Sequence, residues 1–197
     1  MEGIFCANDY VSCELPTEYG WFRFYVWKPI DGKEPVALTT QNLDTSKPVV
    51  IRIHSECLTG DTFCVRNCDC GYQKNRALDI IQRSKNGIFL YDREEGRGIG
   101  LYEKIKAINL QKQGFDTYKA NEELGFGVDI RDYDIPISIL NQFGINTLKV
   151  ITNNPKKLKV LQDKGFDIVE RIEIKKEFDE FNKKYLMEKR IIGNHLI

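Results

Sequence analysis

The front of the chain carries short runs of aromatic and β-branched residues, which is the pattern of β-strands. These runs predict strands over residues 11–15, 21–27, 36–40 and 49–54. Turn signals near Pro16, at Gly20 and at Asp31-Gly32 separate the first three runs, and the last signal is typical of a hairpin. We therefore expect the front of the chain to contribute antiparallel strands.

Helical patterns alternate with short apolar runs in the rest of the chain. Apolar residues recur at helical spacing after residue 71, for example at Ala77, Leu78 and Ile81. The pattern predicts helices from 72 to 84, from 101 until Gly114, from Pro136 until Gly144 and over 156–164, and strands over 88–91, 148–152 and 168–170. This alternation predicts an α/β fold, with a mixed sheet, flanking helices and a strand-rich N-terminal part.

Local signals support two of these helices and predict a further one. Leu101, Ile105 and Ile108 form an apolar stripe at helical spacing. Asn154 is a typical N-cap residue, and Pro155 follows it at the first helical position. The Lys- and Glu-rich tail over 175–190 predicts a solvated helix.

Composition narrows the class of protein. The chain has 197 residues, 42% of them apolar and 29% charged, which allows a single domain spanning residues 1–197 with an ample core. The formal net charge is zero, so we expect no nucleic-acid partner, and local Arg and Lys clusters must hold any anionic ligand. No apolar run is long enough to span a membrane and the first ten residues do not resemble a secretory signal, so we expect a cytoplasmic protein.

Four cysteines lie within fourteen residues, at positions 57, 64, 68 and 70. Thiolates are soft ligands that select zinc, and Cys57, Cys68 and Cys70 are spaced like ligands of one ion. Three thiolates would leave a position for a water that becomes a nucleophile, whereas Cys64 as a fourth ligand would close the site. The cysteines could also be small buried residues, and the spacing alone leaves these alternatives open.

Two polar motifs lie at the ends of predicted strands. Arg52, His54 and Glu56 alternate before Cys57, so in an extended chain they share one face, either beside the metal or exposed to solvent. The Gly-rich turn over 94–100 fits neither a Walker loop nor a dinucleotide fingerprint, although its arginine would suit a phosphate.

Two further motifs carry charge in the second half of the chain. Asp129, Arg131 and Asp132 form either a surface ion-pair cluster or part of a site. Residues 152–157 read Thr-Asn-Asn-Pro-Lys-Lys between a strand and a helix, where backbone N–H groups, a hydroxyl and two ammonium groups could bind an anion.

Together these motifs resemble the GTP cyclohydrolase II family of riboflavin biosynthesis, from about residue 49 to the end of the chain. The resemblance rests on Arg-Ile-His-Ser-Glu-Cys-Leu-Thr-Gly-Asp at 52–61, Cys-Asp-Cys-Gly at 68–71, Arg-Glu-Glu-Gly-Arg at 93–97, Ala-Asn at 120–121 with Leu-Gly-Phe at 124–126, Asp-Ile-Arg-Asp at 129–132, and Thr-Asn-Asn-Pro-Lys-Lys at 152–157. It implies an enzyme that opens the imidazole ring of GTP and releases formate and pyrophosphate, leaving a diaminopyrimidinone ribosyl phosphate.

The resemblance also implies roles for individual residues. Cys57, Cys68 and Cys70 would hold one Zn²⁺ per chain, and Mg²⁺ would accompany the triphosphate. The implied GTP-contacting positions are Arg52, His54, Ser55, Glu56, Gln73, Glu95, Gly96, Arg97, Thr117, Thr152 and Lys157. Arg131 takes the family position of a nucleophile and Asp129 that of a proton acceptor, although a guanidinium that stays protonated is better suited to stabilising phosphate charge. The family also implies a homodimer.

Two positions depart from the family pattern. Val65-Arg66-Asn67 stands where the family usually has a serine and a basic residue before Cys-Asp-Cys. Ile108 replaces a tyrosine whose hydroxyl could orient water or relay a proton during the loss of formate. Our hypothesis is that ring opening survives while formate release is slowed or lost. The alternatives are therefore a paralogue that retains the formyl group, and a non-catalytic zinc- or nucleotide-binding protein.

Overall fold

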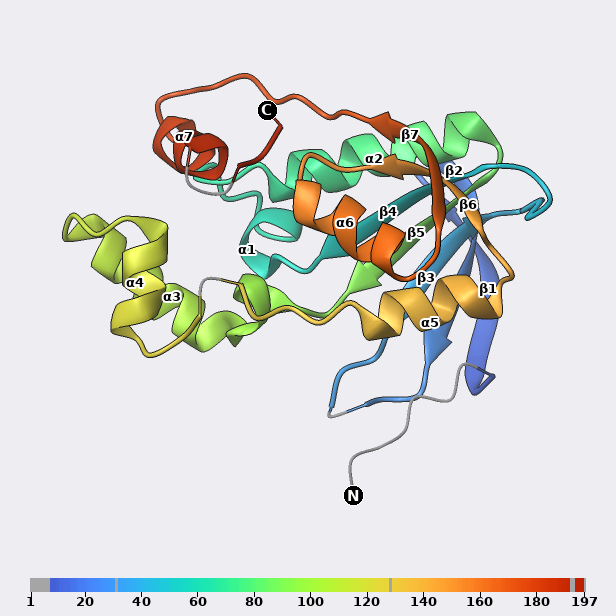
Figure 1. Cartoon of the computed structure of the whole chain (residues 1–197), viewed down its shortest axis with the longest axis horizontal. Coiled ribbons are helices and arrows are strands. Elements are labelled where there is room, and N and C mark those ends of the chain that lie inside the picture. Colours follow the sequence, from blue (N-terminus) through green and yellow to red (C-terminus); the bar gives the residue numbers. More distant parts are fainter. Residues whose placement is uncertain (1–7, 31, 128, 192–193, 197) are drawn as a thin grey trace.

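Seven strands form one mixed sheet in the order β1-β2-β3-β5-β4-β6-β7 (Figure 1). The computed structural model describes residues 8–30, 32–127, 129–191 and 194–196. The strands are β1 (Tyr10–Thr17), β2 (Gly20–Trp27), β3 (Val36–Thr40), β4 (Val49–Ser55), β5 (Gly87–Asp92), β6 (Thr147–Ile151) and β7 (Asp167–Ile172). All seven predicted strands are therefore confirmed, and the hairpin signal falls partly on residue 31, outside the described residues.

The sheet divides into an antiparallel and a parallel half. The antiparallel pairs are β1 with β2, β2 with β3, and β3 with β5, as expected from the front of the chain. β5, β4, β6 and β7 pair parallel. The α/β class and the mixed sheet are confirmed, and the carboxyl ends of the parallel strands lie at a common edge.

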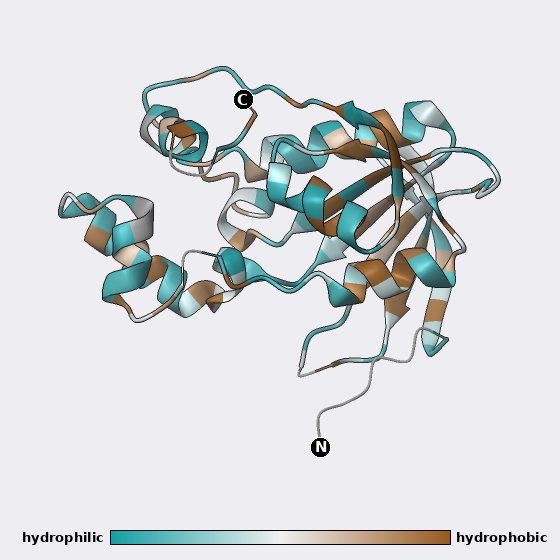
Figure 2. Cartoon of the chain, viewed as in Figure 1, coloured by the Kyte–Doolittle hydropathy of each residue, from teal (hydrophilic) through white to brown (hydrophobic). Residues whose placement is uncertain are grey.

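Helices cover both faces of the sheet. They are α1 (Leu58–Asp61), α2 (Cys70–Ser84), α3 (Gly100–Lys112), α4 (Thr117–Glu123), α5 (Asp134–Gln142), α6 (Pro155–Asp163) and α7 (Lys183–Ile191), with a 3₁₀ turn η1 (Glu95–Gly98). Ile137 and Leu140 of α5 and Leu161 of α6 are buried in one core with the central strands, and Ala77 and Ile81 of α2 are buried in a second. Figure 2 shows the hydrophobic residues concentrated on the central strands and α5.

The predicted start of α6 is confirmed in detail. The Asn154 side chain accepts a hydrogen bond from the backbone N–H of Lys156 at 3.0 Å, and Pro155 occupies the first helical position. This geometry leaves the helix N-terminus pointing toward the carboxyl edge of the sheet, because the helix begins directly after β6. Among the described residues, no helix is both long and apolar enough to cross a membrane.

One prediction about a helix needs correction. The tail is not one solvated helix over 175–190, because only Lys183–Ile191 is helical, and Leu186 and the preceding Asn182 are fully buried. The predicted helix from 101 forms as α3, in which Leu101 and Ile105 of the apolar stripe are exposed and Ala107 is buried. Figure 1 shows α3 and α4 standing away from the sheet, on the same side as α7.

Candidate active site

The site is built from the chain segments that leave three parallel strands at their carboxyl ends. β4 delivers Ser55, Glu56 and Cys57, β5 leads into the Gly-rich turn, and β6 leads into Thr152. Because these strands are neighbours in the sheet, segments far apart in the sequence meet around one cleft, which is the usual place for a ligand in an open α/β sheet.

Three thiols lie together at the wall of this cleft. The Sγ atoms of Cys57, Cys68 and Cys70 lie within 4.8 Å of one another, and those of Cys57 and Cys68 are 3.9 Å apart. A Cβ atom at Gly60 would lie 2.8 Å from the Sγ of Cys68, so only glycine allows this close approach. Cys64 is exposed and lies outside the cluster, which favours the predicted set of three ligands over a closed set of four.

The surroundings of the thiols suit a divalent metal ion. Contacts among the three thiols lower the pKa of Cys57 and raise those of Cys68 and Cys70, so the thiolate form is favoured at Cys57. The Lys104 ammonium lies 3.2 Å from the Cys57 Sγ and 2.8 Å from a Glu95 carboxylate oxygen. Three soft donors within reach of one another could hold a metal ion, and thiolates favour zinc among the divalent metals.

Asp61 connects the thiol cluster to the sheet. Its carboxylate accepts hydrogen bonds from His54 Nε2 at 3.0 Å, from the backbone N–H of Cys57 at 3.0 Å and from the Tyr91 hydroxyl at 3.0 Å. An ionised carboxylate can only accept, so the histidine hydrogen lies on Nε2. His54 Nδ1 is then a buried acceptor that has no hydrogen-bond partner within the described part of the chain, which is the condition of a group awaiting a ligand.

The rest of the cleft is strongly basic. Its wall contains six cationic side chains, those of Arg52, Arg97, Lys104, Arg131, Lys157 and Lys189. Lys157 is buried and donates to the Ile53 carbonyl at 2.8 Å, but burial and the nearby Arg131 and Arg52 hold its pKa well below the usual value. Lys104, Arg131 and Lys189 each pair with a carboxylate. The buried Arg52 and Lys157 donate to neutral groups in the described structure, so this part of the cleft is suited to an anion.

Arg131 crosses from the second half of the chain to the cleft. It holds both carboxylate oxygens of Asp129, at 2.8 and 2.5 Å, and donates to the Ser55 hydroxyl at 3.2 Å. Both side chains of the pair are largely buried, at 11% and 15% exposure, so the pair is not a surface cluster. The Asp129 carboxylate therefore fixes the direction of the guanidinium.

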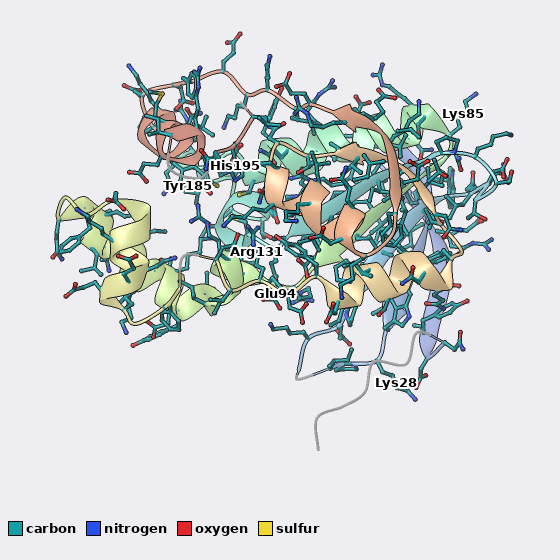
Figure 3. The ribbon with its side chains drawn as sticks, viewed as in Figure 1. Lys28, Lys85, Glu94, Arg131, Tyr185 and His195 are labelled. Carbon is teal, nitrogen blue, oxygen red and sulfur yellow. The ribbon has the colours of Figure 1, made fainter. Side chains whose placement is uncertain are left out.

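The Gly-rich turn forms part of the wall of the cleft. Gly96 and Arg97 both have left-handed backbone angles, with φ of 64° and 65°. That conformation costs little at glycine and about 1 kcal/mol at arginine, so the turn is held by its surroundings. Figure 3 shows Glu94 and Arg131 on one side of the cleft, and Tyr185 and His195 on the other.

Most of the predicted residues meet in this cleft. Its wall contains Arg52, His54, Ser55, Glu56, Cys57, Cys70, Gln73, Glu95, Gly96, Arg97, Arg131, Thr152 and Lys157. Cys68 lines an adjoining cavity, Asp129 lies behind Arg131, and the side chain of Thr117 lies outside the described part of the structure.

Five residues near the site received no role from the sequence: Asp61, Lys104, Tyr185, Lys189 and His195. Lys104 and Lys189 lie in helices rich in charge, where one buried lysine cannot be told from its solvated neighbours. Asp61 was part of a matched motif, but no role followed from its position alone.

Comparison with known proteins decides the family. The family model for GTP cyclohydrolase II matches residues 8–173. The chain belongs to the GTP cyclohydrolase II family. It is 46% identical over 190 residues to a GTP cyclohydrolase-2 of Neisseria meningitidis, with 96% of each chain covered. It is also 46% identical over 186 residues to a GTP cyclohydrolase-2 of Neisseria gonorrhoeae, with 94% of each covered.

Longer proteins contain a similar segment. The riboflavin biosynthesis protein RibBA of Bacillus velezensis is 46% identical over 193 residues, which cover 97% of this chain and 48% of that protein. The family match makes this chain a GTP cyclohydrolase II relative along nearly all of its length, and the predicted family is confirmed.

Proposed function

We propose that this protein opens the imidazole ring of GTP, releasing formate and pyrophosphate and leaving a diaminopyrimidinone ribosyl phosphate. The observation that carries this proposal is a three-thiol cluster beside a cleft rich in cationic side chains, with Cys57 and Cys70 in the wall of that cleft. A nucleoside triphosphate bound along the cleft would place its phosphates among the cations and its base near the thiols.

The basic wall binds the triphosphate in this proposal. Arg52, Arg97 and Lys157 supply charge, and Thr152 supplies a hydroxyl beside the N-terminus of α6. Each phosphate contact is charge-assisted and therefore stronger than a neutral hydrogen bond. The negative phosphates would neutralise the positive charge around the buried Lys157, which would favour substrate binding. Mg²⁺ would offset more of the charge on the phosphates.

Cys57, Cys68 and Cys70 would hold one zinc ion. When bound there, zinc supplies Lewis acidity and lowers the pKa of a coordinated water toward neutrality. His54 is buried beside Asp61 in the wall of the cleft, with Nδ1 as an acceptor for a substrate N–H or a water. Asp61 keeps both the imidazole and the Cys57 backbone in place.

Arg131 acts on the phosphates by charge. Its guanidinium stays protonated, and the hydrogen bonds that it donates to Asp129 orient it, so it is suited to stabilise negative charge as pyrophosphate leaves. Asp129 has both oxygens engaged by Arg131, which supports a positioning role. A nucleophilic arginine would need a neutral guanidine, which this pairing disfavours.

One observation favours a second candidate function. Ile108 lines the cavity that Cys57 and Cys68 also line, so this side chain presents no hydroxyl near the reacting base. A protein that opens the ring but retains the formyl group is therefore the alternative. An Ile108→Tyr variant would restore formate release if that alternative holds.

Product analysis separates these candidates. Purified zinc-loaded protein is incubated with GTP and Mg²⁺, and formate, pyrophosphate and the product mass are measured. Equal amounts of formate and pyrophosphate support the first proposal, and pyrophosphate with a formylated product supports the second. Bound zinc without consumption of GTP would identify a non-catalytic zinc protein.

The assembly and location remain part of the proposal. We propose that residues 1–197 act as a single domain, in a cytoplasmic homodimer, without nucleic acid or a membrane as a partner. The mass of the protein in solution, measured by light scattering, tests the dimer.

A further inference from the structure

The C-terminal segment, described over residues 174–191 and 194–196, forms one side of the cleft, although the family match ends at residue 173. Three of its side chains, those of Tyr185, Lys189 and His195, line the cleft wall. Figure 3 shows Tyr185 and His195 opposite Arg131. None of the three belongs to the residues that the family resemblance assigns to the site.

Buried contacts fasten this segment to the thiol motif. Lys189 Nζ lies 2.5 Å from Oδ1 of Asp69, the residue between Cys68 and Cys70, and both side chains are almost wholly buried. The Asp69 carboxylate also accepts from Gln73, whose amide oxygen in turn accepts from Arg52. An unbroken chain of hydrogen bonds therefore joins the C-terminal helix to the cationic wall.

The same ammonium sets the position of the phenol. Lys189 lies one turn after Tyr185 on α7, and its Nζ is 4.6 Å from the centroid of the Tyr185 ring. This cation–π contact holds the ring against the ion pair, and the buried Leu186 anchors the helix beside it. At the far end, the backbone N–H of Leu196 donates to the Asn153 carbonyl at 2.9 Å, which ties the tail to the loop before α6.

Tyr185 lies where the two cavities of the site meet. It lines both the basic cleft and the adjoining cavity, together with Cys57 and Lys104. Ile108 is in the wall of the second cavity and offers no polar atom there. The Lys104 ammonium is already held by Cys57, Thr59 and Glu95.

We propose that the C-terminal segment is a working part of the active site, in which Tyr185 contacts the substrate beside the thiol cluster and Lys189, paired with Asp69, is its positioning residue. This inference rests on the proposed function. After ring opening, release of formate requires water to add to the formyl carbon and the carbon–nitrogen bond to break, with its electron pair moving to nitrogen. The Tyr185 hydroxyl donates a proton to that nitrogen and regains one from the attacking water, so the step yields an amine and formic acid.

Tyr185→Phe tests the phenol with the least change in shape. Zinc content and GTP affinity should stay near those of the wild type, while formate released per pyrophosphate falls at least about tenfold and a formylated product accumulates. Tyr102→Phe, at an exposed tyrosine of α3 outside both cavities, is the matched control. Ile108→Tyr added to Tyr185→Phe should recover part of the formate, because it returns a phenol to the same cavity.

Lys189→Met tests the positioning role, with Lys189→Arg as the conservative variant and Lys183→Met as the control on the same helix. The methionine variant should lower the ratio of formate to pyrophosphate although Tyr185 is intact, and the arginine variant should recover most of it. A lower melting temperature with an unchanged ratio would show a merely structural lysine and overturn this part.

The outcomes separate this inference from the proposed function. If the wild type consumes no GTP, the proposed function itself fails. If the wild type is active and Tyr185→Phe keeps its turnover and its product ratio, the inference is wrong while the function stands. A wild type that forms pyrophosphate without formate would equally contradict the role of Tyr185.

Discussion

His54 Nε2 lies 3.0 Å from Oδ2 of Asp61, and both side chains are almost wholly buried, at 2% and 3% exposure. The same carboxylate accepts from the backbone N–H of Cys57, so one residue fixes both a candidate metal ligand and the imidazole beside the substrate cleft. This relationship explains why an aspartate follows the first cysteine by one helical turn.

Asp61→Asn should weaken zinc binding, because an amide presents a donor where three donors already converge. Loss of a residue that holds a metal ligand in place typically lowers metal affinity about 10- to 100-fold. We expect zinc affinity to fall in that range, with a similar fall in GTP turnover. Zinc affinity is measured by competition with a chromogenic chelator. Asp163→Asn, at an exposed position of α6, is the control, and an unchanged affinity in Asp61→Asn would contradict the assignment.

Serine substitutions test the membership of the thiol cluster. Cys57→Ser, Cys68→Ser and Cys70→Ser should each lose bound zinc and at least about 100-fold of GTP turnover, because a neutral hydroxyl is a poor zinc ligand. Cys64→Ser should retain both, since this exposed residue lies outside the cluster. Elemental analysis with a turnover assay reads both effects. Loss of zinc in the Cys64 variant would support a closed four-thiolate site instead.

Lys157→Met should separate stability from substrate binding. Burial and neighbouring cations hold the Lys157 pKa well below its usual value, so the ammonium form of Lys157 destabilises the folded state. Methionine removes this cost. We expect the melting temperature to rise by a few degrees and the KM for GTP to rise roughly tenfold. The adjacent exposed Lys156→Met should change neither value appreciably. A Lys157 variant with unchanged KM would remove this residue from the phosphate site.

Asp92 should make stability depend on pH below neutrality. Burial raises its pKa from 3.8 to about 6, so the folded protein holds this proton more tightly than the unfolded chain. The stabilising contribution is complete below pH 4 and is lost as the pH rises through 6, by up to roughly 3 kcal/mol. Urea unfolding of the wild type and Asp92→Asn between pH 4 and 7 measures it. The variant should gain stability relative to the wild type as the pH rises, and a constant difference would contradict the shift.

Local signals predicted the elements well where side chains report directly on the backbone. The β-branched run before the cysteines became β4, and Asn154 with Pro155 marked the start of α6. The fold class followed from the order of these elements, since antiparallel strands at the front and alternating helices behind them allow few arrangements.

The missing parts of the site depend on tertiary contacts. The tail carries many lysines and glutamates, and nothing in its spacing separates the buried Lys189 from solvated neighbours. The apolar spacing of Leu101 and Ile105 predicted the helix α3 correctly, and both side chains are exposed because α3 stands away from the sheet. The spacing of apolar residues predicts that a helix forms, but it does not show which face of the helix packs against the rest of the protein.

The central claim is that the thiol cluster and the basic cleft together convert GTP by hydrolysis of its imidazole ring. The mass of the product formed from GTP by the purified, zinc-loaded protein tests it most directly. The account predicts a diaminopyrimidinone ribosyl phosphate, with one formate and one pyrophosphate released for each GTP consumed. Recovery of unchanged GTP, or of a product with an intact imidazole ring, would contradict it.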